Sequence, residues 1–149
     1  MTAPAAKLLD VNFLVALAWP NHVTRPKAVS WFMANRDTPS ATCPLTEVGF
    51  VGVSMNPLVV TEQLRCAAAL RMLDTYRIRY RHLFWPDPLP LAEALGRLEP
   101  LPGHRQVIDA HLLGLDIDKG GRLVCFDRGI AAITRSEEHT SELQSLSHL

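Results

Sequence analysis

Apolar residues in this chain occur in short blocks of two kinds, separated by polar or proline-rich stretches. Compact apolar runs are typical of buried strands, and four of them occur, over residues 7–10, 41–45, 83–85 and 122–126. Longer segments repeat apolar residues at helical spacing, and over residues 61–80 Leu64, Ala68 and Met72 fall on one face. Further helices are predicted over residues 12–19, from a first turn at Pro26 onward, over 46–54 with Thr46 as N-cap, over 91–98, and between Gly103 and Asp116.

Strands that alternate with helices indicate an α/β fold with a parallel sheet covered on both faces. With 149 residues, 48% of them hydrophobic, the chain is long enough for one domain with a sizeable core. In open parallel sheets, functional sites form outside the carboxyl ends of the strands. We therefore expect the site to consist of residues that follow strands or begin helices at this edge.

Four acidic residues stand at junctions between apolar segments and helices, namely Asp10, Glu47, Asp109 and Asp127. Asp10 and Asp127 directly follow predicted strands. Glu47 begins the helix after a strand, and Asp109 would project across the same edge from the first turns of a helix. Carboxylates in apolar settings are costly unless something pairs with them, so this recurrence predicts a shared compensating charge, most simply a divalent metal ion.

Mg²⁺ and Mn²⁺ suit such a site, because hard dications bind a few carboxylates while keeping waters and substrate phosphate oxygens. Metal binding would relieve the repulsion among converging carboxylates. A site of this kind supports phosphoryl transfer, in which the metal generates hydroxide from bound water and stabilises the leaving oxygen. The sequence has no nucleophile elbow and no glycine-rich phosphate loop, as expected for chemistry that needs no side-chain nucleophile.

Simpler interpretations of the same acids stay open at this point. Asp10 and Asp127 could each cap a following helix, and Glu47 in a first turn could favour the helix dipole without any metal. Asp109 has the weakest structural alternative, because apolar residues such as Ile108 surround it. The four together are hard to explain as unrelated caps.

The charge, the cysteines and the apolar segments of the chain indicate the compartment in which the protein acts. The formal net charge is zero, so no global basic field attracts a polyanion and any nucleic-acid contact must be local. Cys43, Cys66 and Cys125 lie far apart without a C-x-x-C pair, which is typical of a reducing compartment. The apolar stretch over residues 8–19 is too short to span a bilayer, and no signal-peptide cleavage site follows it. We therefore expect a cytoplasmic protein with no membrane association.

Five segments in order resemble the PIN-domain ribonucleases of the VapC toxin family: LLDVNFLVAL, NHVTRPKAVSWF, CPLTEVGF followed by MNP, GHRQVIDAHLLGL, and GGRLVCFDRG. The resemblance covers nearly everything from Lys7 to about Ile133. It implies a three-layer α/β/α sandwich with a central, mainly parallel sheet, and a Mg²⁺- or Mn²⁺-dependent endoribonuclease that is the toxin of a type II toxin-antitoxin module. It also implies a homodimer that acts on RNA and is inhibited by a cognate VapB antitoxin.

The resemblance further implies roles for individual residues. Asp10 matches the family's first metal-binding aspartate, and Glu47 matches the glutamate of the LTE segment. Asp109 matches the aspartate of the DAHLL segment, and Asp127 that of FDR. Asn12 matches a polar position that often supports the site.

Arginines are the candidates for substrate contacts. Arg128, Arg25 and Arg105 could hold RNA phosphates, because a guanidinium group grips a phosphate with two hydrogen bonds. For each of them a solvated surface position is the alternative. The arginines of the 61–80 segment are expected on a solvated face, with an RNA-tracking stripe as the alternative.

The end of the chain differs from the rest. Residues 135–145, RSEEHTSELQS, resemble a reading-frame translation of a common sequencing adapter, and they lack the β-branched pattern expected after a β-α unit. We therefore expect a PIN domain over residues 1–134 and a non-native tail over 135–149, with the family's usual last strand missing.

Two other functions fit parts of the pattern. A haloacid-dehalogenase-like phosphatase would use Asp10 as its nucleophile, but that pattern needs an aspartate two positions later, where this chain has Asn12. A catalytically silent PIN-like module would instead grip RNA or a protein. Binding of Mn²⁺ distinguishes this module from the metal-dependent nuclease.

Overall fold

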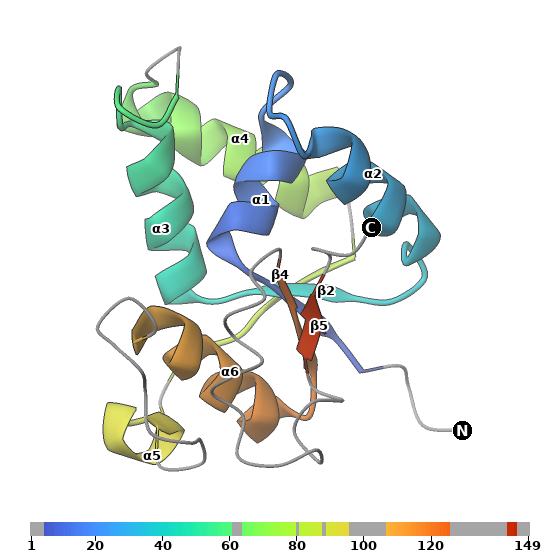
Figure 1. The fold of residues 1–149 in the computed structure, drawn as a ribbon, viewed down its shortest axis with the longest axis vertical. Helices are drawn as coiled ribbons and strands as arrows, with labels where there is room; N and C mark the ends of the chain where they lie inside the picture. Colours follow the sequence, from blue (N-terminus) through green and yellow to red (C-terminus); the bar gives the residue numbers. More distant parts are fainter. Residues whose placement is uncertain are drawn as a thin grey trace.

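The computed structural model describes residues 5–60, 64–79, 81–87, 89–95, 107–125 and 143–145. Its elements, in chain order, are β1 (Lys7–Leu9), α1 (Val11–Ala18), α2 (Arg25–Ala34), β2 (Ser40–Thr42), α3 (Pro44–Ser54), α4 (Cys66–Arg79), β3 (His82–Phe84), α5 (Leu91–Leu95), α6 (Val107–Lys119), β4 (Arg122–Cys125) and β5 (Leu143–Ser145). The strands form one sheet in the order β3-β2-β1-β4-β5, and every pair of neighbours is parallel (Figure 1).

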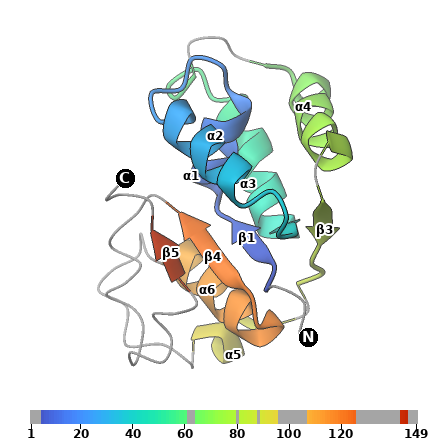
Figure 2. The same ribbon diagram turned by 90° about the vertical axis from the view of Figure 1, so that its right-hand side faces the viewer.

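The sheet lies between two layers of helices. Helices α1 to α4 are on one side and α5 and α6 on the other (Figure 2). Side chains alternate along each strand, so Leu9 and Val124 pack with α1, whereas Leu8 and Leu123 pack with α6. These two buried clusters account for the three-layer α/β/α sandwich, and the predicted fold class is confirmed.

The predicted helices are present, with shifted ends. Helix α3 begins at Pro44 with Cys43 as its N-cap, so the prediction of Thr46 as the N-cap is wrong. Proline suits the first helical position because its missing N–H would be unpaired there in any case. The Thr46 hydroxyl accepts a 2.9 Å hydrogen bond from the backbone nitrogen of Cys43, which completes a capping box two residues inside the helix. Glu47 keeps its predicted place in the first turn.

The tail contributes a strand that the sequence analysis did not anticipate. Strand β5 pairs in parallel with β4, with Leu143 opposite Leu123 and Ser145 opposite Cys125. The expectation that a last strand is missing is therefore wrong. A strand ladder is made by backbone N–H and C=O groups, so an extended segment can cover the exposed edge of β4 without β-branched residues. The expected boundary between residues 134 and 135 stays a prediction.

Close backbone packing joins α5 to α6. A Cβ atom at Gly114 would lie 2.6 Å from the carbonyl oxygen of Ala94, so only glycine allows this approach of the two helices. After α6, Gly120 has a φ of 65°, which is a left-handed conformation that favours glycine, and the chain turns there into β4. This packing fixes α6, whose first turn carries Asp109. Within the described residues, none of the helices is both long and apolar enough for a bilayer crossing.

Candidate active site

Asp10 directly follows the central strand of the sheet. It is only 4% exposed, and its backbone nitrogen donates a 3.0 Å hydrogen bond to the carbonyl oxygen of Val124, which continues the pairing of β1 with β4. Asp10 is also the N-cap residue of α1, yet its side chain makes no capping hydrogen bond to that helix, all of which is described. Capping therefore does not explain why this carboxylate is buried.

Asp109 approaches the same edge of the sheet from the helix layer below. It is half-buried in the first turn of α6, and Leu112 and Leu113, three and four positions later, belong to the core cluster that contains Leu8. Residues at these spacings share one face of a helix, so Asp109 lies on the face of α6 that packs against the sheet. Asp10 is two positions after Leu8 on extended backbone, and strand alternation therefore favours this same layer for its side chain.

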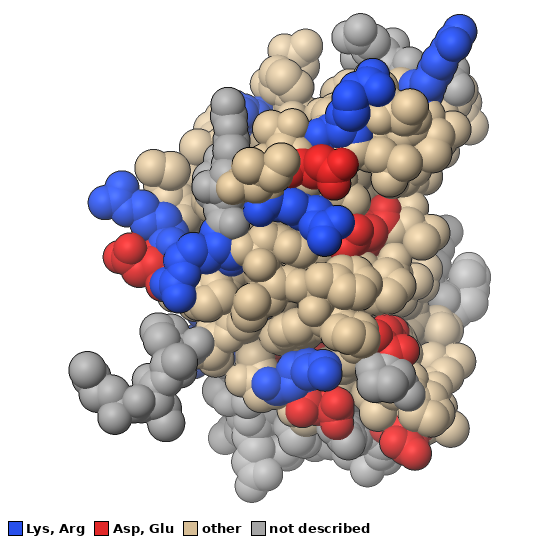
Figure 3. All heavy atoms as spheres, turned by 180° about the vertical axis from the view of Figure 1, so that it is seen from behind, with Lys and Arg blue, Asp and Glu red and all other residues tan. Residues whose placement is uncertain are grey.

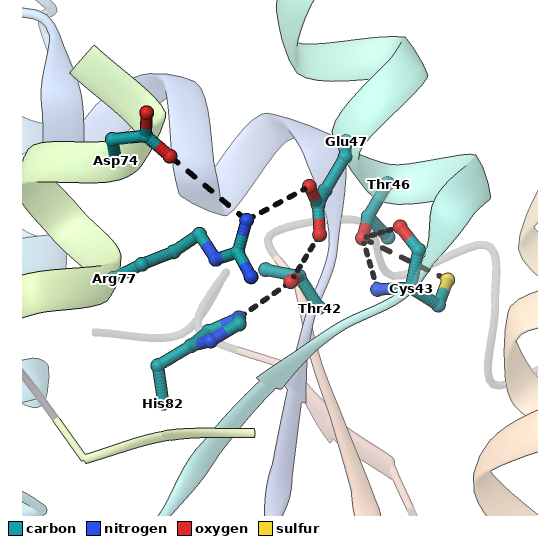
Figure 4. Close-up of polar contacts among 7 residues, drawn as sticks. All are labelled: Thr42, Cys43, Thr46, Glu47, Asp74, Arg77 and His82. Atoms are coloured by element: carbon teal, nitrogen blue, oxygen red, sulfur yellow. Dashed lines mark hydrogen bonds and ion pairs between the residues drawn. The ribbon is translucent and has the colours of Figure 1, made fainter. Parts of the chain in front are cut away.

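Glu47 belongs to a polar cluster on the other side of the sheet edge (Figure 4). Its carboxylate accepts a 2.8 Å hydrogen bond from the hydroxyl of Thr42, the last residue of β2. An Nη1 atom of Arg77 on α4 lies 4.0 Å from Glu47 Oε1 and 3.9 Å from a carboxylate oxygen of Asp74. The Thr42 hydroxyl also lies 2.6 Å from His82 Nε2. Glu47 is therefore contacted from two other elements, β2 and α4, and His82 of β3 is linked to it through Thr42.

His82 is neutral in this cluster. Burial, and to a lesser degree the nearby positive charge of Arg77, lower the pKa of His82 to about 4. Its ring also makes an edge contact with Tyr76, with centroids 5.8 Å apart. A neutral imidazole carries a single N–H. If Nε2 donates to the Thr42 hydroxyl, the proton is on Nε2 and Nδ1 carries none.

Of the other residues predicted for the site, the structure describes Asn12 and Arg25. Asn12 is exposed in the first turn of α1. Arg25, the first residue of α2, lines a cavity of about 210 Å³ together with Leu17 and Ala18, at the end of α1 away from Asp10. Its Nε atom is buried there without a hydrogen-bond partner among the described residues. Asp127, Arg128 and Arg105 lie outside the described residues.

The structure does not gather the described acids into one group. Among the residues it describes, no three His, Cys, Asp or Glu side chains are close enough together to hold a metal ion. Glu47 contacts Arg77 of α4, whereas the spacing of Asp10 and Asp109 from buried core residues favours the α6 layer for both. The fourth predicted member, Asp127, is outside the described residues, so the complete set stays a prediction.

The surface charge is mixed. On the face seen from behind Figure 1, Lys and Arg side chains lie among Asp and Glu side chains (Figure 3). On α4, Arg71 and Arg77 are exposed, but Asp74 between them pairs with Arg77. The helix therefore presents alternating charges, as expected for a solvated face.

The sequence analysis missed several residues that contact the predicted site residues. Thr42, Arg77 and His82 are separated from Glu47 by 5, 30 and 35 positions, so no local spacing connects Arg77 or His82 with it. Their side chains meet because β2 and β3 are neighbours in the sheet and α4 covers them. A second missed pair, Asp87 and His111, joins the segment after β3 to α6, two residues beyond Asp109.

Comparison with known proteins places the chain in a family. No protein-family model matches it. The chain is 44% identical to ribonuclease VapC38 of Mycobacterium tuberculosis over 133 residues. The aligned residues make up 89% of this chain and 93% of the relative. Ribonuclease VapC39 of the same organism is 42% identical over 125 residues, 83% of this chain and 90% of the relative. Ribonuclease VapC29 is 38% identical over 124 residues, 83% of this chain and 87% of the relative. This similarity spans most of both sequences and agrees with the sandwich fold, so the chain belongs to the VapC family of PIN-domain proteins.

Proposed function

We propose that this chain is a metal-dependent endoribonuclease and the toxic component of a type II toxin-antitoxin module. The observation that carries the proposal is the buried carboxylate of Asp10 at the carboxyl end of the central strand. This side chain makes no capping hydrogen bond to α1. The relatives support the same conclusion, since each is named as a ribonuclease of the VapC series.

The donor set suits Mg²⁺ or Mn²⁺. Strand alternation at Asp10 and the helical spacing of Asp109 from the buried Leu112 and Leu113 favour the same layer for both side chains. Both offer only carboxylate oxygens, the ligands that hard dications prefer. We assign them as the main metal-binding residues, with Glu47 and Asp127 as further ligands and Asn12 as a supporting residue. A metal bound there would supply the activated water that hydrolyses the phosphodiester bond and the charge that stabilises the leaving oxygen.

The chain's own residues hold this site in place. The ladder bond from Asp10 to Val124 fixes the backbone at the end of β1, and the buried face of α6 fixes Asp109. Arg25, Arg105 and Arg128 are the proposed contacts to RNA phosphates. Burial of Asp10 excludes bulk water from its carboxylate, which strengthens its attraction to a cation.

The proposal includes the partners that a VapC toxin implies. We expect inhibition by a cognate VapB-type antitoxin, a homodimeric state, and action on RNA in the cytoplasm. Coexpression with a small protein encoded beside this chain, followed by size-exclusion chromatography with light scattering, tests the partner and the dimer together.

Two other functions are weaker. A catalytically silent module that grips RNA or protein is favoured by one observation, the lack of a three-member metal-binding group among the described residues. A haloacid-dehalogenase-like phosphatase has no support from the relatives, and its second aspartate position is occupied by Asn12. A phosphoaspartyl intermediate trapped on Asp10 would be needed to revive it.

Incubation of the purified chain with total RNA tests the proposal directly. Cleavage should require Mg²⁺ or Mn²⁺ and stop when EDTA is added. Tight RNA binding without cleavage at any Mn²⁺ concentration would favour the silent module instead. Cleavage that is unaffected by EDTA would reject the metal-dependent mechanism.

A further inference from the structure

The polar cluster around Glu47 has a defined hydrogen-bond direction. A carboxylate can only accept, so the single hydroxyl hydrogen of Thr42 points at Glu47 Oε2, 2.8 Å away. The oxygen of Thr42 is then left to accept from His82 Nε2–H at 2.6 Å. His82 is neutral and has one N–H to give, so the bonds run from His82 to Thr42 to Glu47 in one order.

The cluster lies close to the edge where Asp10 stands. Ala41 pairs with Leu8 across β2 and β1, so Thr42 is level with Leu9, the residue before Asp10. Neighbouring strands are about 4.8 Å apart, so Thr42, which holds Glu47, lies about one strand spacing from the end of β1. Thr42 is fully buried, whereas the Glu47 side chain keeps 19% of its surface exposed.

We propose that Thr42, His82 and Arg77 are positioning residues that hold the Glu47 carboxylate ready to bind the active-site metal. This inference rests on the proposed function, because it takes Glu47 as a ligand. Arg77 adds a positive charge 4.0 Å from Glu47 Oε1, but its side chain is 41% exposed, so its contribution is smaller than that of the buried Thr42. Partners of this kind orient metal-binding side chains, and their loss typically weakens metal affinity about 10- to 100-fold.

A matched pair of substitutions at Thr42 separates positioning from structure. Thr42→Val keeps the shape of the side chain and removes the hydroxyl. Thr42→Ser keeps the hydroxyl and removes a buried methyl group, so it should lower thermal stability more than it affects the site. We expect calorimetry without RNA to show Mn²⁺ affinity about tenfold weaker in Thr42→Val and close to wild type in Thr42→Ser.

Substitutions at His82 and Arg77 extend the test. His82→Gln retains an N–H donor and should preserve Mn²⁺ affinity, whereas His82→Phe should weaken it as Thr42→Val does. Arg77→Met should weaken affinity about two- to threefold, and Arg71→Met, an exposed arginine on the same helix, should have no effect. In RNA cleavage, the loss should appear as a higher Mn²⁺ requirement with an unchanged KM for RNA.

Each outcome decides the inference. Wild-type Mn²⁺ affinity in Thr42→Val, equal losses in the valine and serine variants, or tighter binding in Arg77→Met would overturn it. The last result would mean that Arg77 competes with the metal for Glu47. If Thr42→Val is unchanged while Asp10→Asn abolishes metal-dependent cleavage, the positioning role fails and the proposed function stands. If Asp10→Asn retains full cleavage, the proposed function itself fails.

Discussion

The backbone nitrogen of Asp10 lies 3.0 Å from the carbonyl oxygen of Val124 and donates a hydrogen bond to it. This bond extends the parallel ladder of β1 and β4 by one residue beyond β1, so Asp10 is held as part of the sheet. Asp10 is buried, and strand alternation favours the α6 side for its carboxylate, the layer to which the first turn of α6 brings Asp109. Asp10 is thus held by backbone pairing at the centre of the sheet.

Stability should depend on pH through His82. Burial and Arg77 lower the pKa of His82 from its ordinary value of 6.5 to about 4. The unfolded chain therefore takes up a proton on this residue at higher pH than the folded protein does, and the free energy of unfolding should fall as the pH is lowered from about 6.5 to about 4. Above about pH 6.5 the residue should have no effect, since it is neutral in both states.

Chemical denaturation of the wild type and of His82→Gln at about pH 7 and about pH 4.5 checks this expectation. The glutamine variant should lose less stability between the two pH values, because it has no group to titrate at this position. Carboxylates titrate in both proteins and cancel in the comparison. Identical pH dependence in the two proteins would contradict the assignment of His82 as a half-buried group with a lowered pKa.

Two glycines in helices should respond in opposite directions to alanine. Gly114→Ala places a methyl group 2.6 Å from the Ala94 carbonyl and should cost about 1–3 kcal/mol of stability, because α5 must move away from α6. Gly52→Ala, in the interior of α3 with nothing within 4 Å of the added Cβ, should stabilise by about 0.5–1 kcal/mol. Urea denaturation measures both. A stabilised Gly114→Ala variant would show that the two helices are not in close contact.

The Asp87–His111 pair should contribute to the stability of α6. Its side chains are only 13% and 12% exposed, so His111→Ala would leave a largely buried carboxylate without its partner, at a cost of about 2 kcal/mol. The double variant Asp87→Ala, His111→Ala should lose less than the sum of the two single variants. Strict additivity in a double-mutant cycle would mean that the pair contributes no interaction energy.

The fold was predictable where local pattern and packing agree. The apolar run before Asp10 and the helical spacing after it are properties of neighbouring residues, so β1, α1 and the position of Asp10 followed from them. The start of α3 was misplaced because both Pro44 and Thr46 are helix-start signals, and Thr46 acts from inside the first turn. Strand β5 was missed because backbone pairing does not require a β-type sequence.

The site was predictable only in part, for a related reason. Asp10, Glu47 and Asp109 are marked by charge in apolar surroundings, which is visible in one sequence. The contacts of Glu47 with Thr42 and Arg77 depend on how β2, α3 and α4 meet in space. No spacing in the sequence encodes the direction in which Glu47 is held.

The most direct measurement is Mn²⁺ binding and RNA cleavage by Asp10→Asn and Asp109→Asn, compared with Asp118→Asn, an exposed residue on α6 that serves as the control. We expect both site variants to remain folded by circular dichroism, to lose Mn²⁺ binding by calorimetry, and to lower RNA cleavage at least about 100-fold, while the control behaves as the wild type. Asn keeps the shape of Asp but removes the charge that attracts the dication. Full cleavage and unchanged Mn²⁺ affinity in either site variant would contradict the account of a metal held between these two carboxylates.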